Sequence, residues 1–198
     1  MATYVVVVAV AAAILVAATA HAFPQDAWID LAVFLAAAVT SERWAVSSSI
    51  EGGMSLSLTV GFAAAILYGP AFAGIVAIGG VLISDLLISH RHWTRVVFNA
   101  GQLALSAGLA AIAYQELAVP GPVDLSQDAL AIAVAAVVFL LVNDTLVTVV
   151  ISLQGRSFLH EWTASFREMG ILYVSMAPLG ALLAFAYQDS RWNVLYFP

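Results

Sequence analysis

The chain contains no cysteine and no lysine, and charged residues make up only 9% of its 198 residues. Without cysteine it can form no disulfide, no thiolate nucleophile and no cysteine-ligated metal cluster. Without lysine it cannot hold retinal as a Schiff base, which excludes a rhodopsin. A soluble domain carries about a quarter charged residues. Too few charges are therefore present here to cover a surface that faces water.

The charges that are present are mostly negative, since twelve acidic residues against six arginines give a net charge of −6. Nucleic-acid binding requires a basic face, so we expect no nucleic-acid partner. Hydrophobic residues make up 63% of the chain, and strand-like alternation is nearly absent. In lipid, an isolated segment satisfies its backbone groups only as a helix. The composition therefore predicts an all-α, polytopic transmembrane helical bundle whose first partner is the lipid bilayer.

Seven apolar segments are separated by polar or turn-forming residues. They cover residues 3–20, 28–40, 54–68, 71–89, 96–114, 129–153 and 170–187. A helix needs about 20 apolar residues to cross a hydrocarbon core of about 30 Å, so we expect about seven helices, within a range of six to eight. The first segment lacks a basic start, and we interpret it as a retained helix rather than a cleaved leader. Gly69-Pro70 predicts a tight turn and a helical hairpin.

The last part of the chain predicts two further features. Phe158, Trp162 and Phe166 recur at helical spacing among charged residues, which predicts a short helix lying in the membrane interface. In the seventh segment, Pro178 is expected to kink or end the helix. The apolar run 194–198 is typical of the start of another segment. One interpretation is that residues 1–198 form a single integral-membrane domain, cut from a longer polypeptide before a cytoplasmic output domain. The other is that the second segment does not cross.

The arginines indicate how the chain is threaded. Arg43, Arg91, Arg95, Arg156 and Arg167 fall in or beside connections that share one side if every segment crosses. The opposite connections hold Asp26, Glu116, Asp124 and Asp128 and no arginine. Basic residues accumulate in cytoplasmic loops. The pattern therefore predicts a multi-pass protein whose amino terminus is cytoplasmic.

Polar residues inside the apolar segments are the candidate site. Asn99, Gln102 and Ser106 are spaced i, i+3 and i+7, so they form one stripe on a helix. Asp144 is the deepest acid of the chain. The full candidate set for a ligand-binding or buried polar cluster is Asp144, Asn143, Asn99, Gln102, Ser106 and Asp85. One interpretation is a polar cavity for an unknown small-molecule ligand. The other is that these groups join helices and that Asp85 pairs with a basic neighbour at the interface.

A basic cluster on the predicted cytoplasmic face consists of His90, Arg91, His92 and Arg95. Histidines near a carboxylate can bind a divalent metal, but an H-x-H pair alone is a weak signal, and interfacial histidines are usually amphipathic anchors. Haem held by two histidines would need them buried at matched depth, whereas all four histidines sit at segment ends, so we expect no metal and no cofactor. The sequence has no nucleophile–base pair, phosphate-binding glycine loop or metalloprotease motif. We therefore expect no catalytic residues, and a protein that is not an enzyme.

Several short runs resemble a known family. They are Met54-Ser55-Leu56-Ser57, Tyr68-Gly69-Pro70, residues 95–103 (RVVFNAGQL) with Ser106, Asn143, Gly155-Arg156 and Ala177-Pro178-Leu179. They resemble the MASE-like multi-helix membrane sensor domain that bacteria place amino-terminal to HD-GYP, HD phosphohydrolase and GGDEF signalling domains. The resemblance covers nearly the whole chain. It implies a sensor or input domain in the bacterial cytoplasmic (inner) membrane that passes a signal to a cytoplasmic partner or output domain and catalyses nothing itself.

Two alternatives remain open. The chain is similar in length and helix number to the substrate-binding subunits of energy-coupling-factor vitamin transporters, which would make it a small-molecule binding or transport subunit. A structural accessory subunit of a larger membrane complex, or a homo-oligomer, would instead use its small-residue faces to pack against partners. Solute uptake into liposomes would favour the first alternative, and co-purification of a stable assembly would favour the second.

Overall fold

The computed structural model describes the backbone of residues 1–42 and 57–190, and the side chains within these ranges except those of residues 42 and 168–174. The described residues form seven α-helices, one 3₁₀ turn and one π-helical segment, and no strand. In chain order they are α1 (Ala2–Thr19), η1 (Ala20–Ala22), α2 (Trp28–Glu42), α3 (Ser57–Tyr68), α4 (Pro70–Val81), the π-helical η2 (Leu82–Ile88), α5 (Trp93–Leu117), α6 (Ala129–Ser152) and α7 (Phe158–Asp189). The predicted all-α bundle is confirmed.

The number of membrane crossings stays a prediction. Within the described residues, four helices are long and apolar enough to span a bilayer: α1 with η1, α4 with η2, α5 and α6. The helices α2 and α3 are apolar but shorter. The expectation of about seven crossings therefore depends on how α2, α3 and α7 sit in the membrane.

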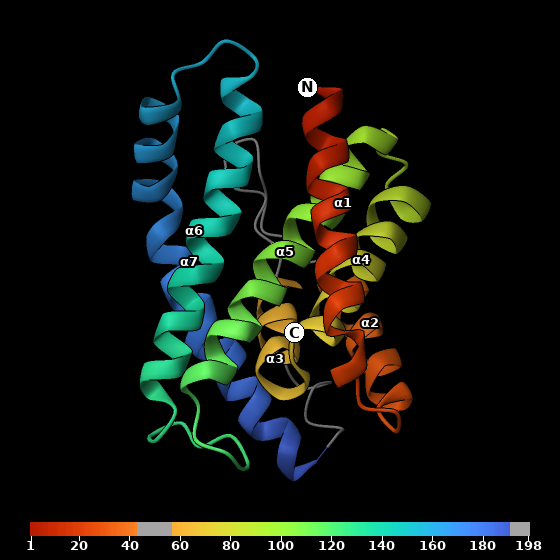
Figure 1. Cartoon of the computed structure of the whole chain (residues 1–198), viewed down its shortest axis with the longest axis vertical. Coiled ribbons are helices and arrows are strands. Elements are labelled where there is room, and N and C mark those ends of the chain that lie inside the picture. Colours follow the sequence, from red (N-terminus) through yellow and green to blue (C-terminus); the bar gives the residue numbers. More distant parts are fainter. Residues whose placement is uncertain (43–56, 191–198) are drawn as a thin grey trace.

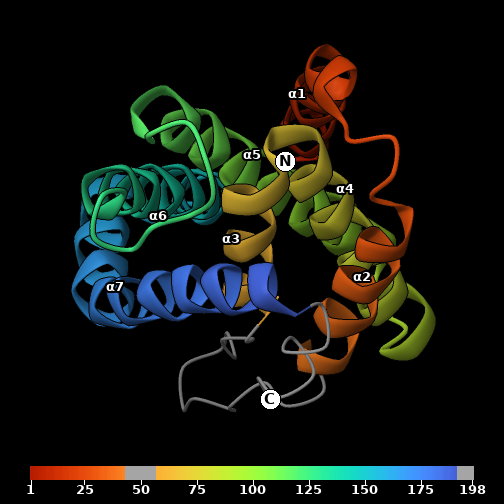
Figure 2. The same ribbon diagram turned by 90° about the horizontal axis from the view of Figure 1, so that it is seen from below.

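Helix α5 lies at the centre of the bundle. It contacts α1, α3, α4 and α6 and runs obliquely between α6 and α1 (Figure 1). Seen along the bundle, α3 is enclosed between α5 and α7, and α2 packs against α3 and α4 (Figure 2). The helices α6 and α7 form one edge of the bundle.

Small residues let these helices approach closely. A Cβ atom added to Gly101 of α5 would lie 3.1 Å from the Cα atom of Ala9 on α1, so the two backbones are in contact there. A Cβ atom on Gly180 of α7 would lie 3.0 Å from the carbonyl oxygen of Thr59 on α3. Such contacts replace the hydrophobic driving force that lipid does not provide between helices.

The outer surface of the bundle is apolar. On α1, Val6, Val7, Val10 and Ile14 are between 50% and 62% exposed. Large exposed aliphatic and aromatic side chains also cover the outer faces of α6 and α7. An apolar surface of this extent would aggregate in water, so this face contacts lipid and the chain is a membrane protein.

The predicted hairpin between the third and fourth segments is confirmed. Gly69 has φ +82°, a left-handed conformation that favours glycine, and Pro70 occupies the first turn of α4. The helices α3 and α4 pack against each other on either side of this turn.

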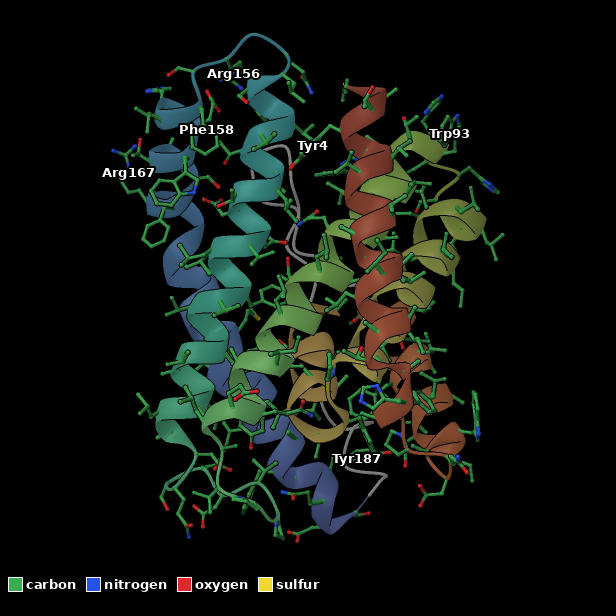
Figure 3. All side chains as sticks on the ribbon, in the orientation of Figure 1. Tyr4, Trp93, Arg156, Phe158, Arg167 and Tyr187 are labelled. Atoms are coloured by element: carbon green, nitrogen blue, oxygen red, sulfur yellow. The ribbon has the colours of Figure 1, made fainter. Side chains whose placement is uncertain are left out.

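The two described connections that the arginine pattern assigns to one side, between η2 and α5 and between α6 and α7, lie at one end of the bundle, which we call the arginine end. Trp93 at the start of α5, together with Arg156 and Arg167, lies in the same half as the amino terminus, and Tyr187 lies at the opposite end (Figure 3). The connection between α5 and α6 also lies at that opposite end (Figure 1). Arg43 and the apolar run 194–198 lie outside the described residues.

The separate interfacial helix that the sequence predicts before the seventh segment is not observed. Phe158 begins α7, a single helix of 32 residues that continues through Pro178 to Asp189. The charged residues of its first turns sit at the arginine end, and the helix carries on into the bundle. The prediction of a separate helix lying in the interface is therefore wrong, and Pro178 does not end the seventh segment.

Candidate functional site

Five of the six polar residues predicted as one cluster take part in three separate contacts, each between neighbouring elements of the bundle. Asp85 and Asn99 join η2 to α5, Gln102 and Asn143 join α5 to α6, and Asp144 joins α6 to α7. The sixth residue, Ser106, donates its hydroxyl to the carbonyl oxygen of Gln102 on its own helix at 2.8 Å.

Asp85 is buried where α4 ends, and two side chains donate to its carboxylate. The Arg91 Nη1 atom lies 3.3 Å from Asp85 Oδ1, and Asn99 Nδ2 donates to Oδ2 at 3.2 Å. The expected pairing of Asp85 with a basic neighbour is thus observed, and Arg91 is that neighbour. The Arg91 side chain is 43% exposed, so water partly screens this ion pair.

The π-helical segment η2 explains why this carboxylate points inward. The Ser89 amide donates to the carbonyl oxygen of Ser84 at 2.9 Å, five residues back, and the Arg91 amide donates to the carbonyl oxygen of Asp85 at 2.8 Å. The widened turns bury the consecutive side chains of Ser84 and Asp85 together. His90, with φ +49°, takes the left-handed conformation that ends the segment. Single π-turns of this kind occur often at functional sites.

The second contact lies inside the bundle. Gln102 Nε2 donates to Asn143 Oδ1, and both side chains are buried. Hydrogen bonds between membrane helices contribute about 0.6–2 kcal/mol each. This pair therefore fixes the rotation of α5 relative to α6 as well as their distance.

The third contact is made by Asp144, which is 3% exposed. Asn143 and Asp144 are consecutive, so their side chains leave α6 about 100° apart and reach different neighbours. Ser165 Oγ of α7 donates to Asp144 Oδ1, whereas Oδ2 has no hydrogen-bond partner among the described residues. Sequence reasoning missed Ser165 because it falls in the segment that was expected to lie in the interface.

The basic cluster divides in the structure. The His92 Nδ1 atom accepts a hydrogen bond from the Thr94 amide and caps α5. Arg91 pairs with Asp85, His90 shapes the turn, and Arg95 is exposed on the first turn of α5. These residues share one corner of the arginine end and have separate structural roles. Within residues 1–42 and 57–190, no three histidine or acidic side chains converge as metal ligands would.

The opposite end of the bundle holds buried acids that the sequence did not single out as a site. Asp128 accepts hydrogen bonds from the Tyr114 hydroxyl at 3.0 Å and from the amides of Val119 and Asp124, each at 3.1 Å. Asp30 accepts the Tyr187 hydroxyl at 2.6 Å. Burial of a carboxylate is costly without hydrogen-bond donors. These hydrogen bonds offset that cost and stabilise this end of the bundle.

Asp124 lies on the surface of the connection between α5 and α6. The Ser126 hydroxyl and the amides of Gln127 and Ser126 donate to its carboxylate, and these hydrogen bonds hold the pKa of Asp124 below its ordinary value. Nearby, Gln188 of α7 exchanges two hydrogen bonds with the backbone of Val123, at 2.7 and 3.2 Å. The connection is therefore tied to the end of α7.

A small, partly open cavity lies between α3, α4 and α5. Its volume is about 20 Å³, and it is lined mostly by Gly, Ala and aliphatic residues that include Gly61, Val76 and Leu103. A volume of this size holds about one water molecule. The residues of the three polar contacts do not line this cavity.

Comparison with known protein families identifies a match over most of the chain. The sequence pattern of the MASE9 family, a family of membrane-associated sensor domains, matches residues 28–191. The match begins at the first residue of α2 and extends just past the end of α7. No curated protein and no solved structure matches the chain.

Proposed function

Because this chain belongs to the MASE9 family of membrane-associated sensor domains, we propose that it is an input module that passes a signal to a cytoplasmic partner or output domain. The module catalyses nothing itself. Its ligand or stimulus acts on the bundle, and the response is a change in how the helices pack at the arginine end.

The observation that supports this proposal is the order of the polar contacts. Asp85 with Asn99, Gln102 with Asn143, and Asp144 with Ser165 join η2, α5, α6 and α7 in sequence. A shift of one helix changes a buried hydrogen bond to the next, and hydrogen-bond geometry is directional. The contacts can therefore transmit a displacement across the bundle to the connections at the arginine end.

The proposed orientation places the arginine end in the cytoplasm of a bacterium, at the inner membrane, following the tendency of basic residues to stay inside. Single cysteines test it, because the chain has none of its own. Ser89→Cys lies beside the connection between η2 and α5, and Ser126→Cys lies in the connection between α5 and α6. In intact cells, a membrane-impermeant maleimide should label only Ser126→Cys. Labelling of Ser89→Cys alone would show that the arginine end faces away from the cytoplasm, the opposite of the proposed orientation.

The route to the output depends on the length of the native polypeptide. Since α7 runs from the arginine end to the opposite end, an output domain in the same polypeptide needs one further crossing to reach the cytoplasm. A separate partner would dock directly at the arginine end. The intact mass of the native polypeptide, compared with 20.8 kDa for this chain, decides which output is assayed.

The test of function is the activity of that output. Gln102→Leu removes the donor to Asn143 and should change the output activity per folded molecule, while Ser106→Ala is the matched control because its hydroxyl bonds only within α5. Membrane levels and unfolding curves report folding separately. The proposal would be contradicted if output activity per folded molecule were unchanged by Gln102→Leu. It would also be contradicted if the protein had no catalytic domain and no partner.

A further inference from the structure

Asp144 is bonded differently from the other buried acids described here. Asp128 accepts three hydrogen bonds, and Asp85 is held by an arginine and an asparagine. Asp144 is equally buried, yet Ser165 is the one described donor, and Oδ2 has no partner. A charged carboxylate in this position lacks the compensation that burial demands.

The position of Asp144 along α6 places it within reach of one side of the membrane. It lies eight residues from the end of α6 at Ser152, or about 12 Å below the arginine end at the rise of an α-helix. The other end of α6 is about 23 Å away. The arginine end is therefore the nearer end of α6 for exchange with water.

The charged and titratable groups on the neighbouring helices are directed elsewhere. Tyr4 of α1 donates to the carbonyl oxygen of Leu146 at 3.2 Å, and Glu161 of α7 pairs with Arg156 at 3.0 Å. The remaining groups near this level among the described side chains are Arg95 of α5 and His160 and Arg167 of α7, all exposed. No cation among the described side chains offsets a charge on Asp144.

We propose that Asp144 is a proton-binding site, and that loss of its proton is the signal that rearranges α7 against α6. The neutral carboxyl removes the uncompensated charge, and Ser165 still donates to Oδ1. When the proton leaves to water at the arginine end, the carboxylate gains a full charge inside the bundle. This proposal deepens the proposed function, because it names the proton as the ligand of the sensor.

The structure also contains a donor for the deprotonated state. Trp162 Nε1 is buried and has no hydrogen-bond partner in the part of the chain that the structure describes. Trp162 and Ser165 are three residues apart and therefore on one side of α7, about 4.5 Å apart along its axis. A shift of α7 along α6 by about 4.5 Å would bring Trp162 to the level that Ser165 holds beside Asp144. Deprotonation thus favours a second packing of the two helices.

The proton is measured directly by infrared difference spectroscopy of the full chain in lipid nanodiscs. The carbonyl stretch of a protonated carboxylic acid is separate from the carboxylate bands. We expect such a band at neutral pH, its loss in Asp144→Asn, and its persistence in Asp30→Asn, which removes another buried acid. A band unchanged by Asp144→Asn overturns the proposal.

Ser165→Ala keeps the result decisive if Asp144→Asn does not fold. It leaves the carboxyl group in place and removes the hydroxyl that donates to Oδ1. The band should then shift to higher frequency, because the carbonyl has lost a hydrogen bond. An unshifted band assigns the proton to another acid and excludes Asp144.

The rearrangement is measured with spin labels at Leu141→Cys and Phe166→Cys, two exposed positions on α6 and α7. The label-to-label distance should change between neutral and alkaline pH in the otherwise native chain. The change should be lost in Asp144→Asn, and also in Trp162→Phe, which keeps the infrared band but has no indole N–H. A change that persists in both variants refutes the coupling.

Failure of this inference can be told apart from failure of the proposed function. The infrared band reports protonation in the isolated chain, whether or not any output responds. If Asp144→Asn leaves the output fully responsive while Gln102→Leu alters it, the sensor role stands and the proton is excluded as its signal. If neither variant alters the output, the sensor role fails as well.

Discussion

A methyl group added at Gly101 measures how tightly α1 is held against α5. The new Cβ atom would lie 3.1 Å from Ala9 Cα and 3.3 Å from the Val8 carbonyl carbon, which are backbone atoms that cannot rotate away. Overpacking of this kind costs about 1–3 kcal/mol. Replacing glycine by alanine in a helix returns about 1 kcal/mol of propensity. We therefore expect Gly101→Ala to destabilise the fold by about 0–2 kcal/mol.

Gly61→Ala is the matched control, because a Cβ atom there meets nothing within 4 Å. It gains the same propensity without the clash, so it should stabilise the fold by about 0.5–1 kcal/mol. Unfolding in detergent micelles followed by tryptophan fluorescence gives both values. Gly101→Val should enlarge the effect at the same contact. Equal free energies of unfolding for the two alanine variants would refute the close packing of α1 on α5.

Three further changes have defined outcomes. Arg91→Gln leaves Asp85 with one donor and should cost about 1–2 kcal/mol in the same assay, discounted because the arginine is partly exposed. Tyr187→Phe removes a donor from buried Asp30 and should cost about 1–3 kcal/mol. The hydrogen bonds to Asp124 lower the pKa of its carboxyl group in the folded state. These bonds therefore stabilise the fold at pH above the unfolded-state pKa of about 3.9, and the stabilisation is lost as the pH falls through the lower folded-state pKa. An NMR titration checks this.

Each of these changes has a control elsewhere in the chain. Arg95→Gln alters an exposed arginine and should leave the free energy of unfolding unchanged. Tyr4→Phe removes a hydroxyl bonded at 3.2 Å to a backbone oxygen and should cost less than Tyr187→Phe. Ser126→Ala should move the pKa of Asp124 back toward its ordinary range. Equal costs for the two arginine variants, or for the two tyrosine variants, would contradict the assigned contacts.

The fold was predictable where the sequence contains strong local signals. Long apolar runs predicted α1, α5 and α6 with ends close to those observed, and Gly69-Pro70 predicted the hairpin of α3 and α4. The start of α7 was not predictable in this way. Charged and aromatic residues at helical spacing are typical of an interfacial helix, but they equally suit the end of a long helix that rises out of the bundle.

The candidate site was predicted by residue type but not by arrangement. Asn99, Gln102, Asn143 and Asp144 were predicted because they are polar residues inside apolar segments. Each of them forms a hydrogen bond to a neighbouring element. Their grouping depends on the rotation of each helix, which periodicity along one segment cannot give. Ser165 was missed because a serine in an amphiphilic stretch has no distinguishing pattern until the opposite helix is known.

The buried acids that α7 contacts along its length, Asp144 and Asp30, are satisfied to different degrees. At the end opposite the arginines, Asp128 accepts three donors, Asp30 accepts a tyrosine hydroxyl, and Gln188 ties α7 to the neighbouring connection. In the arginine half, Asp144 has one described donor and an unpaired oxygen. A fully bonded polar network stiffens its surroundings, whereas a partly bonded one leaves a second arrangement close in energy. We therefore expect α7 to pivot about its end near Tyr187, so that small rearrangements at Asp144 become larger displacements at the arginine end.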